Sequence, residues 1–413
     1  MDRTILHVDM NNCYASIMML YYPKLRGNPV AVGGDVEKRH GIILARNYES
    51  KEYGVRVGQT LWEAKQKCPS LIIVPPDYDK FPRHSRLLRE LLSEYSDQVE
   101  PFGLDESWVD VTGSASLFGD GEHIANEIRE RVKFELGVTV SVGVSYNKIF
   151  SKLGSDIKKP DATTIITPEN YKEVVWKLPA SDLLGVGLAT KKVFKKYSIR
   201  TIGDIAKMPE EYLQYWFGKW GIFLHCYANG MDTSPVKTVA YEAWVKSIGN
   251  STTCPRDLQN EQEAYIVFYN LAESVSARMR DCGLKARTVQ ISLRTNDLLW
   301  CDRQMTLEKP TMITPELVDA AMELLRKNFR WEKPLRSIGI RGTNLIPISG
   351  AEQLTMFSDE EKREKLEKIE YAVDGIRKRF GYSSIGRAIL SIDEQLGKID
   401  AKVDHAVHPI GYL

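Results

Sequence analysis

The sequence predicts a multidomain α+β protein, and three observations lead to this fold class. The chain has 413 residues, more than one domain usually holds, so three or more domains are expected. Strand and helix patterns alternate over the first 170 residues, and a tight turn between two apolar strands favours a mainly antiparallel sheet. Residues 171–235 then show short helical patterns, whereas residues 241–346 return to strands accompanied by two amphipathic helices.

The first strand is expected at residues 4–10, an apolar and β-branched run with Asp9 near its end. A helix over 14–21 follows, and Pro23 and the turn at 27–29 stop it. Further strands are expected at 30–32, 41–45 and 71–74, and further helices at 48–53, 60–68 and 77–95. The last of these helices carries four leucines on one stripe, which indicates a buried face.

A hairpin is expected next, with strands at 99–102 and 107–111 and a turn at 103–106. A helix over 122–136 and a strand over 138–144 complete a βαβ-like unit. In the second half, residues 289–294 alternate as a strand does, and helices are expected at 260–281 and 315–329. A charged helix over 359–380 closes the pattern, and the sequence gives it no function beyond packing on the body of the protein.

Composition limits the classes of function. The net charge of +1 points to no partner by itself, because a nucleic-acid binder needs only clustered positive charge. The six cysteines form no CxxC pair, which favours a reducing cytoplasm and argues against a structural zinc site. No apolar run reaches membrane-spanning length and the N-terminus lacks a signal-peptide pattern, so we expect a cytoplasmic protein without a membrane partner.

Three carboxylates are the strongest candidates for chemistry. Asp105 and Glu106 are adjacent in the hairpin turn, where irregular backbone lets both serve one site. Burying two carboxylates together is costly unless a cation such as Mg²⁺ neutralises them. Asp9 supplies a third if its strand lies beside the hairpin, which would create a two-metal site for phosphoryl displacement. The alternative is a solvated hairpin tip, and spacing alone does not exclude it.

Several stretches in order resemble the Y-family translesion DNA polymerases of the bacterial polymerase IV type. Together they span roughly residues 1–346, and their order makes the resemblance specific. They are His7-Val8-Asp9-Met10-Asn11, Ala45-Arg46-Asn47-Tyr48-Glu49, Tyr53-Gly54-Val55, Leu104-Asp105-Glu106-Ser107, residues 141–148, Lys158-Lys159-Pro160-Asp161, residues 183–187 and Lys246-Ser247-Ile248-Gly249.

The resemblance implies a right-hand architecture. It places a palm at 1–20 and 75–170, fingers at 21–74, a helical thumb at 171–235, an α/β little finger at 241–346 and a C-terminal tail at 347–413. It also implies template-directed transfer of nucleotides from dNTPs to a primer 3′-hydroxyl, with low fidelity. Two Mg²⁺ ions would be held by Asp9, Asp105, Glu106 and the carbonyl of Met10.

The family pattern implies contacts to the incoming nucleotide. Tyr14 stands where an aromatic ring blocks a ribose 2′-hydroxyl, although a core aromatic is the alternative. Tyr48, Lys51 and Lys159 match positions that hold the triphosphate. Lys51 departs from the usual Arg and cannot grip bidentately. Ile42 and Leu44 fall where the family roofs the nascent base pair, and their size predicts a narrower template pocket unless they only pack the fingers.

DNA contacts are expected in the last two domains. Residues 183–187 and the lysines that follow resemble a helix-hairpin-helix, in which Gly185 and Gly187 let backbone amides approach a phosphate. Lys191 and Lys192 would add attraction that is independent of base sequence, although a solvated helix face is the alternative. In the little finger the candidate contacts are basic residues on the expected strands and helices, together with three hydroxyl residues. They are Arg278, Arg280, Lys285, Arg287, Arg294, Arg336 and Arg341, with Ser247, Ser251 and Thr252.

The tail contains Gln353-Leu354-Thr355-Met356-Phe357, which resembles the peptide that binds the bacterial sliding clamp. Leu354, Met356 and Phe357 would fill an apolar cleft while Gln353 bonds at its edge. The expected partners are primer-template DNA, dNTPs and the clamp, for a monomeric enzyme. Two other functions stay open: a nucleotidyl cyclase, which needs no DNA grips, and an idle DNA-binding factor, which would not need the carboxylates.

Overall fold

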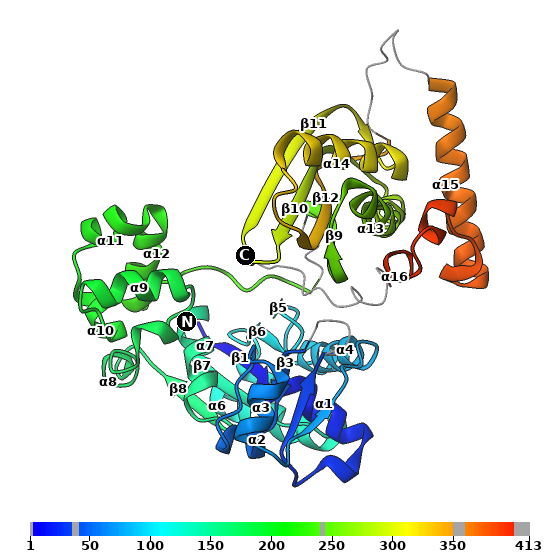
Figure 1. Cartoon of the computed structure of the whole chain (residues 1–413). Coiled ribbons are helices and arrows are strands. Elements are labelled where there is room, and N and C mark those ends of the chain that lie inside the picture. The colour runs from blue at the N-terminus through cyan, green and yellow to red at the C-terminus, as the bar shows by residue number, and fades with distance from the viewer. Residues whose placement is uncertain (1–2, 35–40, 240–243, 350–359, 400–413) are drawn as a thin grey trace. The chain divides into compact units, whose positions relative to one another are not determined.

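A computed structural model of the chain describes residues 3–34, 41–239, 244–349 and 360–399. The chain forms two compact units (Figure 1). The first contains residues 3–33 and 42–239, and the second contains residues 244–349 and 360–399. Helices and sheets are mixed in both units, which agrees with the predicted α+β class.

A five-stranded sheet forms the centre of the first unit, in the order β5-β6-β1-β7-β8. Only the β7–β8 pair is parallel among these neighbours, so the prediction of a mainly antiparallel sheet is confirmed. The strands are β1 (Ile5–Met10), β5 (Val99–Phe102), β6 (Glu106–Asp110), β7 (Val140–Ser145) and β8 (Thr163–Ile166). The expected turn at 103–106 is one residue too long, because Glu106 already pairs with Phe102 and Asp9 and so begins β6.

Helices pack on this sheet and bury its apolar residues. The shared core includes Leu6 and Val8 of β1, Leu88 of α4, Ile128 of α6 and Val142 of β7. The helices are α1 (Cys13–Tyr21), α4 (Lys80–Ser93), α5 (Ala115–Phe118), α6 (Gly121–Arg131), its π-helical continuation η2 (Val132–Leu136) and α7 (Lys148–Ile157). Asn147 caps α7 by accepting a hydrogen bond from the Phe150 amide, which fixes where this helix starts.

A smaller sheet of three strands, in the order β3-β2-β4, has its own core. The elements are η1 (Pro23–Leu25), β2 (Val30–Gly33), β3 (Ile43–Arg46), α2 (Tyr48–Glu52), α3 (Leu61–Lys67) and β4 (Ile72–Val74). Asn47 caps α2, and Thr60 and Glu63 form a capping box at the start of α3. These caps fix where both helices of the smaller sheet begin.

Short helices make up the rest of the first unit, here called the helical lobe. Its core includes Phe194, Ile202, Leu213 and Leu224. The elements are α8 (Tyr171–Val174), η3 (Ala180–Asp182), α9 (Leu188–Lys196), α10 (Ile202–Lys207), α11 (Glu210–Phe217) and α12 (Lys219–Ala228). Figure 1 shows them gathered in one lobe.

The second unit is a four-stranded antiparallel sheet in the order β11-β10-β12-β9, with α13 and α14 on one face (Figure 1). Residues from these helices and from alternate positions of β10 and β12 form one core, which includes Phe268, Leu317, Ile291 and Ile340. The elements are β9 (Ser247–Leu258), α13 (Glu261–Asp281), β10 (Leu284–Thr295), β11 (Trp300–Thr311), α14 (Thr314–Asn328) and β12 (Leu335–Pro347).

The C-terminal segment is also folded over residues 360–399. It contains α15 (Glu360–Phe380), η4 (Tyr382–Ser384), η5 (Ala388–Ser391) and α16 (Glu394–Gly397). Leu396 of α16 is fully buried in the core of the second unit. This part of the expected tail therefore belongs to the second unit. None of the helices described in the structure combines the length and apolar character needed to cross a membrane.

Candidate active site

Asp9 and Glu106 face each other across two neighbouring strands. They are register partners in the β1–β6 pair, so their side chains project from the same face of the sheet. Asp9 is almost fully buried, while Glu106 keeps partial exposure. The sequence could not settle whether Asp9 reaches the hairpin, and this register brings it there.

Asp105 lies in the turn just before β6, and Gly103 with a φ of 82° opens that turn. The backbone amide of Met10 donates a hydrogen bond to the Asp105 carbonyl over 2.9 Å, which fastens the turn to the end of β1. Asp105, Asp9 and Glu106 are close enough for their charges to interact. All three predicted carboxylates and the Met10 backbone thus lie at one end of the sheet.

Two lysines from the region of α7 enter this cluster. Lys152 Nζ lies 2.7 Å from Glu106 Oε2 and 3.7 Å from Asp9 Oδ2. Lys159 Nζ lies 2.8 Å from Asp9 Oδ2 and 2.8 Å from Asp156 Oδ1. Lys159 was singled out from the sequence, whereas Lys152 was not. A single lysine in an amphipathic helix gives no local signal that it reaches a carboxylate far away in the sequence.

His7 is a second site residue that sequence reasoning missed. Its ring is fully buried, with Nδ1 2.8 Å from Ser155 Oγ and Nε2 3.3 Å from Glu106 Oε2. Burial, supported by the charge of Lys152, lowers the pKa of His7 well below its usual range. The ring is therefore neutral and packs beside Glu106. Its position two residues before Asp9, on the same strand face, was the available signal.

The cluster carries more negative than positive charge. Burial raises the pKa of Asp9, and the charge of Glu106 adds to this effect, although both lysines oppose it. Burial also raises the pKa of Asp105 to about 6, again with contributions from Glu106 and Asp9. The ionised carboxylates of this cluster repel one another, and a hard divalent cation such as Mg²⁺, which prefers oxygen ligands, would remove that repulsion. His7, Asp9 and Glu106 also offer ligand atoms within 4.8 Å of one another.

Tyr14 stands beside the carboxylates at the start of α1. Its ring stacks on Phe81 of α4, with ring centres 4.0 Å apart and planes 4° from parallel. Burial, with the charges of Cys13 and Asp105, raises the pKa of Tyr14 to about 12. The phenol is therefore neutral, half-buried and held rigidly near Asp105.

Tyr48 and Lys51 lie on α2 of the smaller sheet. The ammonium of Lys51 lies 5.6 Å from the centre of the Tyr48 ring. Burial raises the pKa of Tyr48, and the charges of Lys159 and Asp9 also act on it. The charges of the carboxylate cluster thus act on Tyr48, although α2 belongs with the smaller sheet and the cluster with the five-stranded sheet.

Ile42 and Leu44 flank the start of β3. Ile42 is 42% exposed and Leu44 is partly exposed, whereas Ile43 between them is fully buried. The core of the smaller sheet takes Ile43 and not its neighbours. Ile42 therefore keeps exposed surface outside this core.

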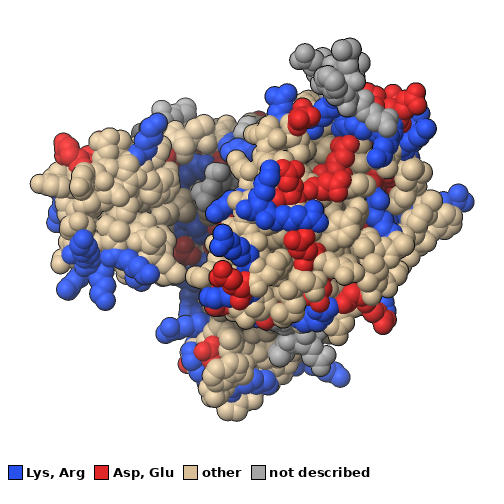
Figure 2. Space-filling view, turned by 45° about the horizontal axis from the view of Figure 1, so that its top comes forward, with Lys and Arg blue, Asp and Glu red and all other residues tan. Residues whose placement is uncertain are grey.

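Gly185 and Gly187 enclose the turn before α9 in the helical lobe. Gly185 has a φ of 88°, and a Cβ there would lie 2.1 Å from the Trp220 ring, so only glycine fits. A Cβ on Gly187, the N-cap of α9, would meet nothing within 4 Å. Lys191 and Lys192 on the following helix are exposed. Figure 2 shows Lys and Arg side chains projecting from the lower edge of this lobe.

The predicted DNA contacts of the second unit are not all alike. Ser247, Arg294 and Arg341 share one face of the sheet by register, and α13 and α14 pack on the opposite face. Arg294 lies over the Trp300 ring at 5.0 Å. Arg287 and Arg336 fall at irregularities of β10 and β12, where the register shifts. Ser247, Arg294 and Arg341 therefore lie on one sheet face, whereas regular register does not place Arg287 and Arg336 there.

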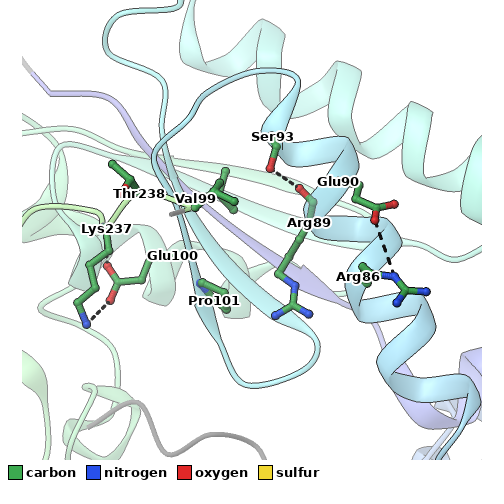
Figure 3. Close-up of a pocket in the computed structure, with 10 residues that line it drawn as sticks. Arg86, Arg89, Glu90, Ser93, Val99, Glu100, Pro101, Lys237 and Thr238 are labelled. Atoms are coloured by element: carbon green, nitrogen blue, oxygen red, sulfur yellow. Dashed lines mark hydrogen bonds and ion pairs between the residues drawn. The ribbon is translucent and has the colours of Figure 1, made fainter. Parts of the chain in front are cut away.

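A hollow of about 500 Å³ lies away from the carboxylates, between α4, β5 and residues 237–239 (Figure 3). Glu100 in its wall lies 2.7 Å from Lys148 Nζ and accepts a hydrogen bond from the Lys237 amide over 3.0 Å. The Val239 amide donates to the Asp97 carbonyl over 2.9 Å. These bonds fasten the segment after the helical lobe along the edge strand of the sheet.

The peptide Gln353, Leu354, Met356 and Phe357, predicted to bind the clamp, lies outside the described residues.

Comparisons with known proteins agree with this geometry. Residues 8–156 match the impB/mucB/samB family, and residues 245–356 match the impB/mucB/samB family C-terminal domain. A DNA polymerase IV of Acetivibrio thermocellus is 51% identical over 399 residues, covering 97% of this chain and all of the relative. One from Pelotomaculum thermopropionicum is 38% identical, covering 93% and 94% of the two chains.

Among solved structures, a Y-family DNA polymerase chimera, Dbh-Dpo4(243-245)-Dbh, has the same fold. It gives a TM-score of 0.72 at 22% identity and covers 83% of this chain and 99% of its own. The chain therefore belongs to the impB/mucB/samB family, the Y family of DNA polymerases. It is a DNA-directed DNA polymerase of the lesion-bypass type, similar to the DNA polymerase IV relatives over nearly its whole length.

Proposed function

We propose that the chain copies damaged templates by two-magnesium nucleotidyl transfer, with Asp9, Asp105 and Glu106 as the metal ligands. The observation that carries this proposal is the β1–β6 register, which sets Asp9 opposite Glu106 with Asp105 in the adjoining turn. Bound Mg²⁺ would lower the pKa of the primer 3′-hydroxyl and neutralise charge on the phosphates. The Met10 carbonyl would add a ligand at the end of β1.

The two lysines act as counter-charges for the carboxylates. Lys152 holds Glu106, and Lys159 holds Asp9 and Asp156. Burial lowers the pKa of Lys159, but the nearby carboxylates of Asp9 and Asp156 raise it more, so the pKa of Lys159 stays above its usual value. Both ammonium groups thus stay protonated, and Lys159 can turn from Asp9 to a nucleotide phosphate. Tyr48 and Lys51 would bind the same triphosphate from the smaller sheet.

Tyr14 is the proposed steric gate against ribonucleotides. Phe81 stacks on one face of its ring and supports it, so a 2′-hydroxyl would meet a supported wall. Tyr14→Ala should therefore admit ribonucleotides in primer extension, while incorporation of dNTPs persists. Phe81→Leu is a useful companion variant, because it removes the stacking support and keeps the gate residue. Unchanged discrimination in Tyr14→Ala would remove this assignment.

The other ligand contacts follow the parts of the right hand, with the helical lobe as thumb and the second unit as little finger. Gly185 and Gly187 would let backbone amides meet a DNA phosphate, with Lys191 and Lys192 beside them. Ser247, Arg294 and Arg341 would track the backbone from the helix-free sheet face, with Arg287 and Arg336 as outlying contacts. Such contacts make primer-template binding depend steeply on salt.

Low fidelity, reduced tolerance of bulky adducts and clamp stimulation complete the proposal. The exposed Ile42 and its neighbour Leu44 would roof the nascent base pair, and Ile42→Ala should widen adduct bypass. Deleting residues 353–357 should abolish synthesis that depends on a bacterial sliding clamp and leave unaided synthesis intact. All six cysteines are free thiols, which fits a monomer working in the reducing cytoplasm.

Primer extension on a damaged and an undamaged template tests the central proposal. The intact chain with Mg²⁺ should extend both primers, and Asp105→Ala should extend neither. Glu364→Gln, an exposed acid on α15, is the matched control and should behave as the intact chain does. Extension by Asp105→Ala at the rate of the control would exclude the carboxylate mechanism.

A further inference from the structure

The helix α15 has its charged and apolar residues in an unusual arrangement. A helix that packs on a domain normally buries an apolar stripe and exposes charge. In α15, Glu370 is 4% exposed, whereas Ile369, Ile376 and Phe380 are 53%, 37% and 65% exposed. None of the apolar side chains of α15 is among those that pack on the core of the second unit, within residues 360–380.

Charged contacts hold α15 to the second unit. Arg280 of α13 lies 2.6 Å from Asp374 and 3.2 Å from Glu370. Arg377 lies 2.9 Å from Glu273 of α13, and Thr314 of α14 donates to Glu370 over 2.9 Å. Glu370, Asp374 and Arg377 fall within one arc of about 60° around α15. The helix is therefore docked through this charged arc and not through its apolar residues.

The apolar residues form a second arc beside the first. We call Leu366, Ile369, Val373, Ile376 and Phe380 the outer stripe. Their spacing of three, four, three and four residues is the a/d repeat of a coiled coil, and it covers about 21 Å of helix. Leu366 and Val373 are half-buried and the other three are exposed. An exposed stripe of this kind marks an interaction surface.

Charge beside the outer stripe indicates the kind of partner. Lys365, Lys368 and Arg379 border the stripe together with Glu361, which gives this border a net charge of two positive. A second copy of the chain would bring the same positive border against it. An a/d seam is also narrower than the broad apolar face with which helices lie on membranes. The border instead complements acidic residues at the e and g positions of a partner helix.

We propose that the outer stripe of α15 docks an acidic amphipathic helix from another protein, packed side by side with α15 as in a coiled coil. The proposal goes beyond DNA synthesis, because it concerns a surface with no predicted role in the polymerase site. It also differs from clamp binding, which was assigned to residues 353–357. The second unit would thereby carry a protein-binding surface in addition to its DNA-binding sheet face.

The test uses the full chain and a fluorescent synthetic helix of three heptads, with Leu at a and d and Glu at e and g. Fluorescence anisotropy should show saturable binding that weakens with salt. The double variant Ile369→Gln, Ile376→Gln removes two apolar side chains of the outer stripe and should bind about tenfold more weakly or worse. Glutamine favours helix, so α15 itself should remain folded. Leu117→Gln, a change at an 81% exposed leucine of the first unit, is the matched control and should bind normally.

Four further measurements complete the test. A peptide with Lys at e and g should bind poorly, and equal binding would overturn the choice of an acidic partner. Sedimentation velocity should show a monomer, and a dimer that the double variant abolishes would identify a second copy as the occupant. The chain should not co-sediment with anionic phospholipid vesicles. Co-sedimentation that the double variant abolishes would identify a membrane surface as the occupant. Circular dichroism should show that the double variant keeps its fold, and absence of acidic-peptide binding would overturn the proposal.

Discussion

Two regions of the molecule bury clusters of charge, and they balance it differently. At the end of the five-stranded sheet, four carboxylates meet two ammonium groups, namely Asp9, Asp105, Glu106 and Asp156 against Lys152 and Lys159. Under α15, three carboxylates meet three guanidinium groups, namely Glu273, Glu370 and Asp374 against Arg280, Arg377 and Arg387.

The difference separates a site from a structural contact. In the balanced cluster each carboxylate has an Arg partner, and such a network fixes one helix on another. In the cluster at the sheet the acids outnumber the bases, and burial and mutual repulsion raise the pKa values of Asp9 and Asp105. The unbalanced cluster can therefore bind an additional cation, whereas the charges of the balanced cluster already neutralise one another. Removing one cation from each cluster tests this contrast.

The largest effect on stability is expected from Arg280→Met. The variant leaves Glu370 and Asp374 without their shared cation, and breaking a buried ion network in this way costs about 3 to 5 kcal/mol. Urea unfolding of the second unit should show the loss, and Mg²⁺ should not restore it. Restoration by Mg²⁺ would mean that this cluster also works as a cation site.

Lys152→Met should have a similar but smaller effect, and Mg²⁺ should reverse it. The change removes a cation from Glu106 and Asp9, and we expect the metal-free chain to lose about 2 to 3 kcal/mol of unfolding free energy. Added Mg²⁺ supplies the missing charge and should recover most of the loss. Lys152→Arg is the control and should stay close to wild type. A loss that Mg²⁺ leaves unchanged would show that Lys152 is only a packing residue.

Lys51→Arg should have a small favourable effect on nucleotide binding. Arg can bind a phosphate with two parallel hydrogen bonds, whereas Lys is a point charge. Steady-state primer extension should show KM for the dNTP falling by about threefold to tenfold, with kcat unchanged. A KM that does not move would place Lys51 outside the triphosphate site, in keeping with its position over the Tyr48 ring.

Much of the fold could be predicted because its patterns are local. An apolar, β-branched run indicated β1, and two apolar strands around a tight turn indicated the β5–β6 hairpin. Helical periodicity indicated α4, α13 and α14 within a few residues. The hairpin turn was predicted one residue too long, because Glu106 pairs with Asp9, a partner that local patterns do not reveal. Local patterns also do not reveal the parallel pairing of β7 with β8, because strand pairing depends on contacts between residues distant in sequence.

The structure brings the predicted carboxylates together and adds one lysine and one histidine that were not predicted. Asp9, Asp105 and Glu106 lie together, and the family pattern pointed to Lys159. Lys152 and His7 were missed because each belongs to an ordinary helix or strand pattern. The packing of α7 on the sheet brings Lys152 to Glu106, and the pairing of β1 with β6 brings His7 there. Packing of α15 on the body was expected, but the burial of its charged side was not, because the charged residues of a helix usually face solvent.

The unfolding free energy of Asp105→Asn without metal, followed against pH, tests the central claim most directly. Because the folded pKa of Asp105 is about 6, above the unfolded value, its ionisation costs stability as pH rises from about 4 to 6. At pH 7 in EDTA the variant should therefore be more stable than wild type, by at most about 3 kcal/mol, and the gap should close as pH falls toward 4. Mg²⁺ should stabilise wild type more than the variant. A variant less stable than wild type at pH 7 in EDTA, or equal stabilisation of both by Mg²⁺, would contradict an unbalanced carboxylate site.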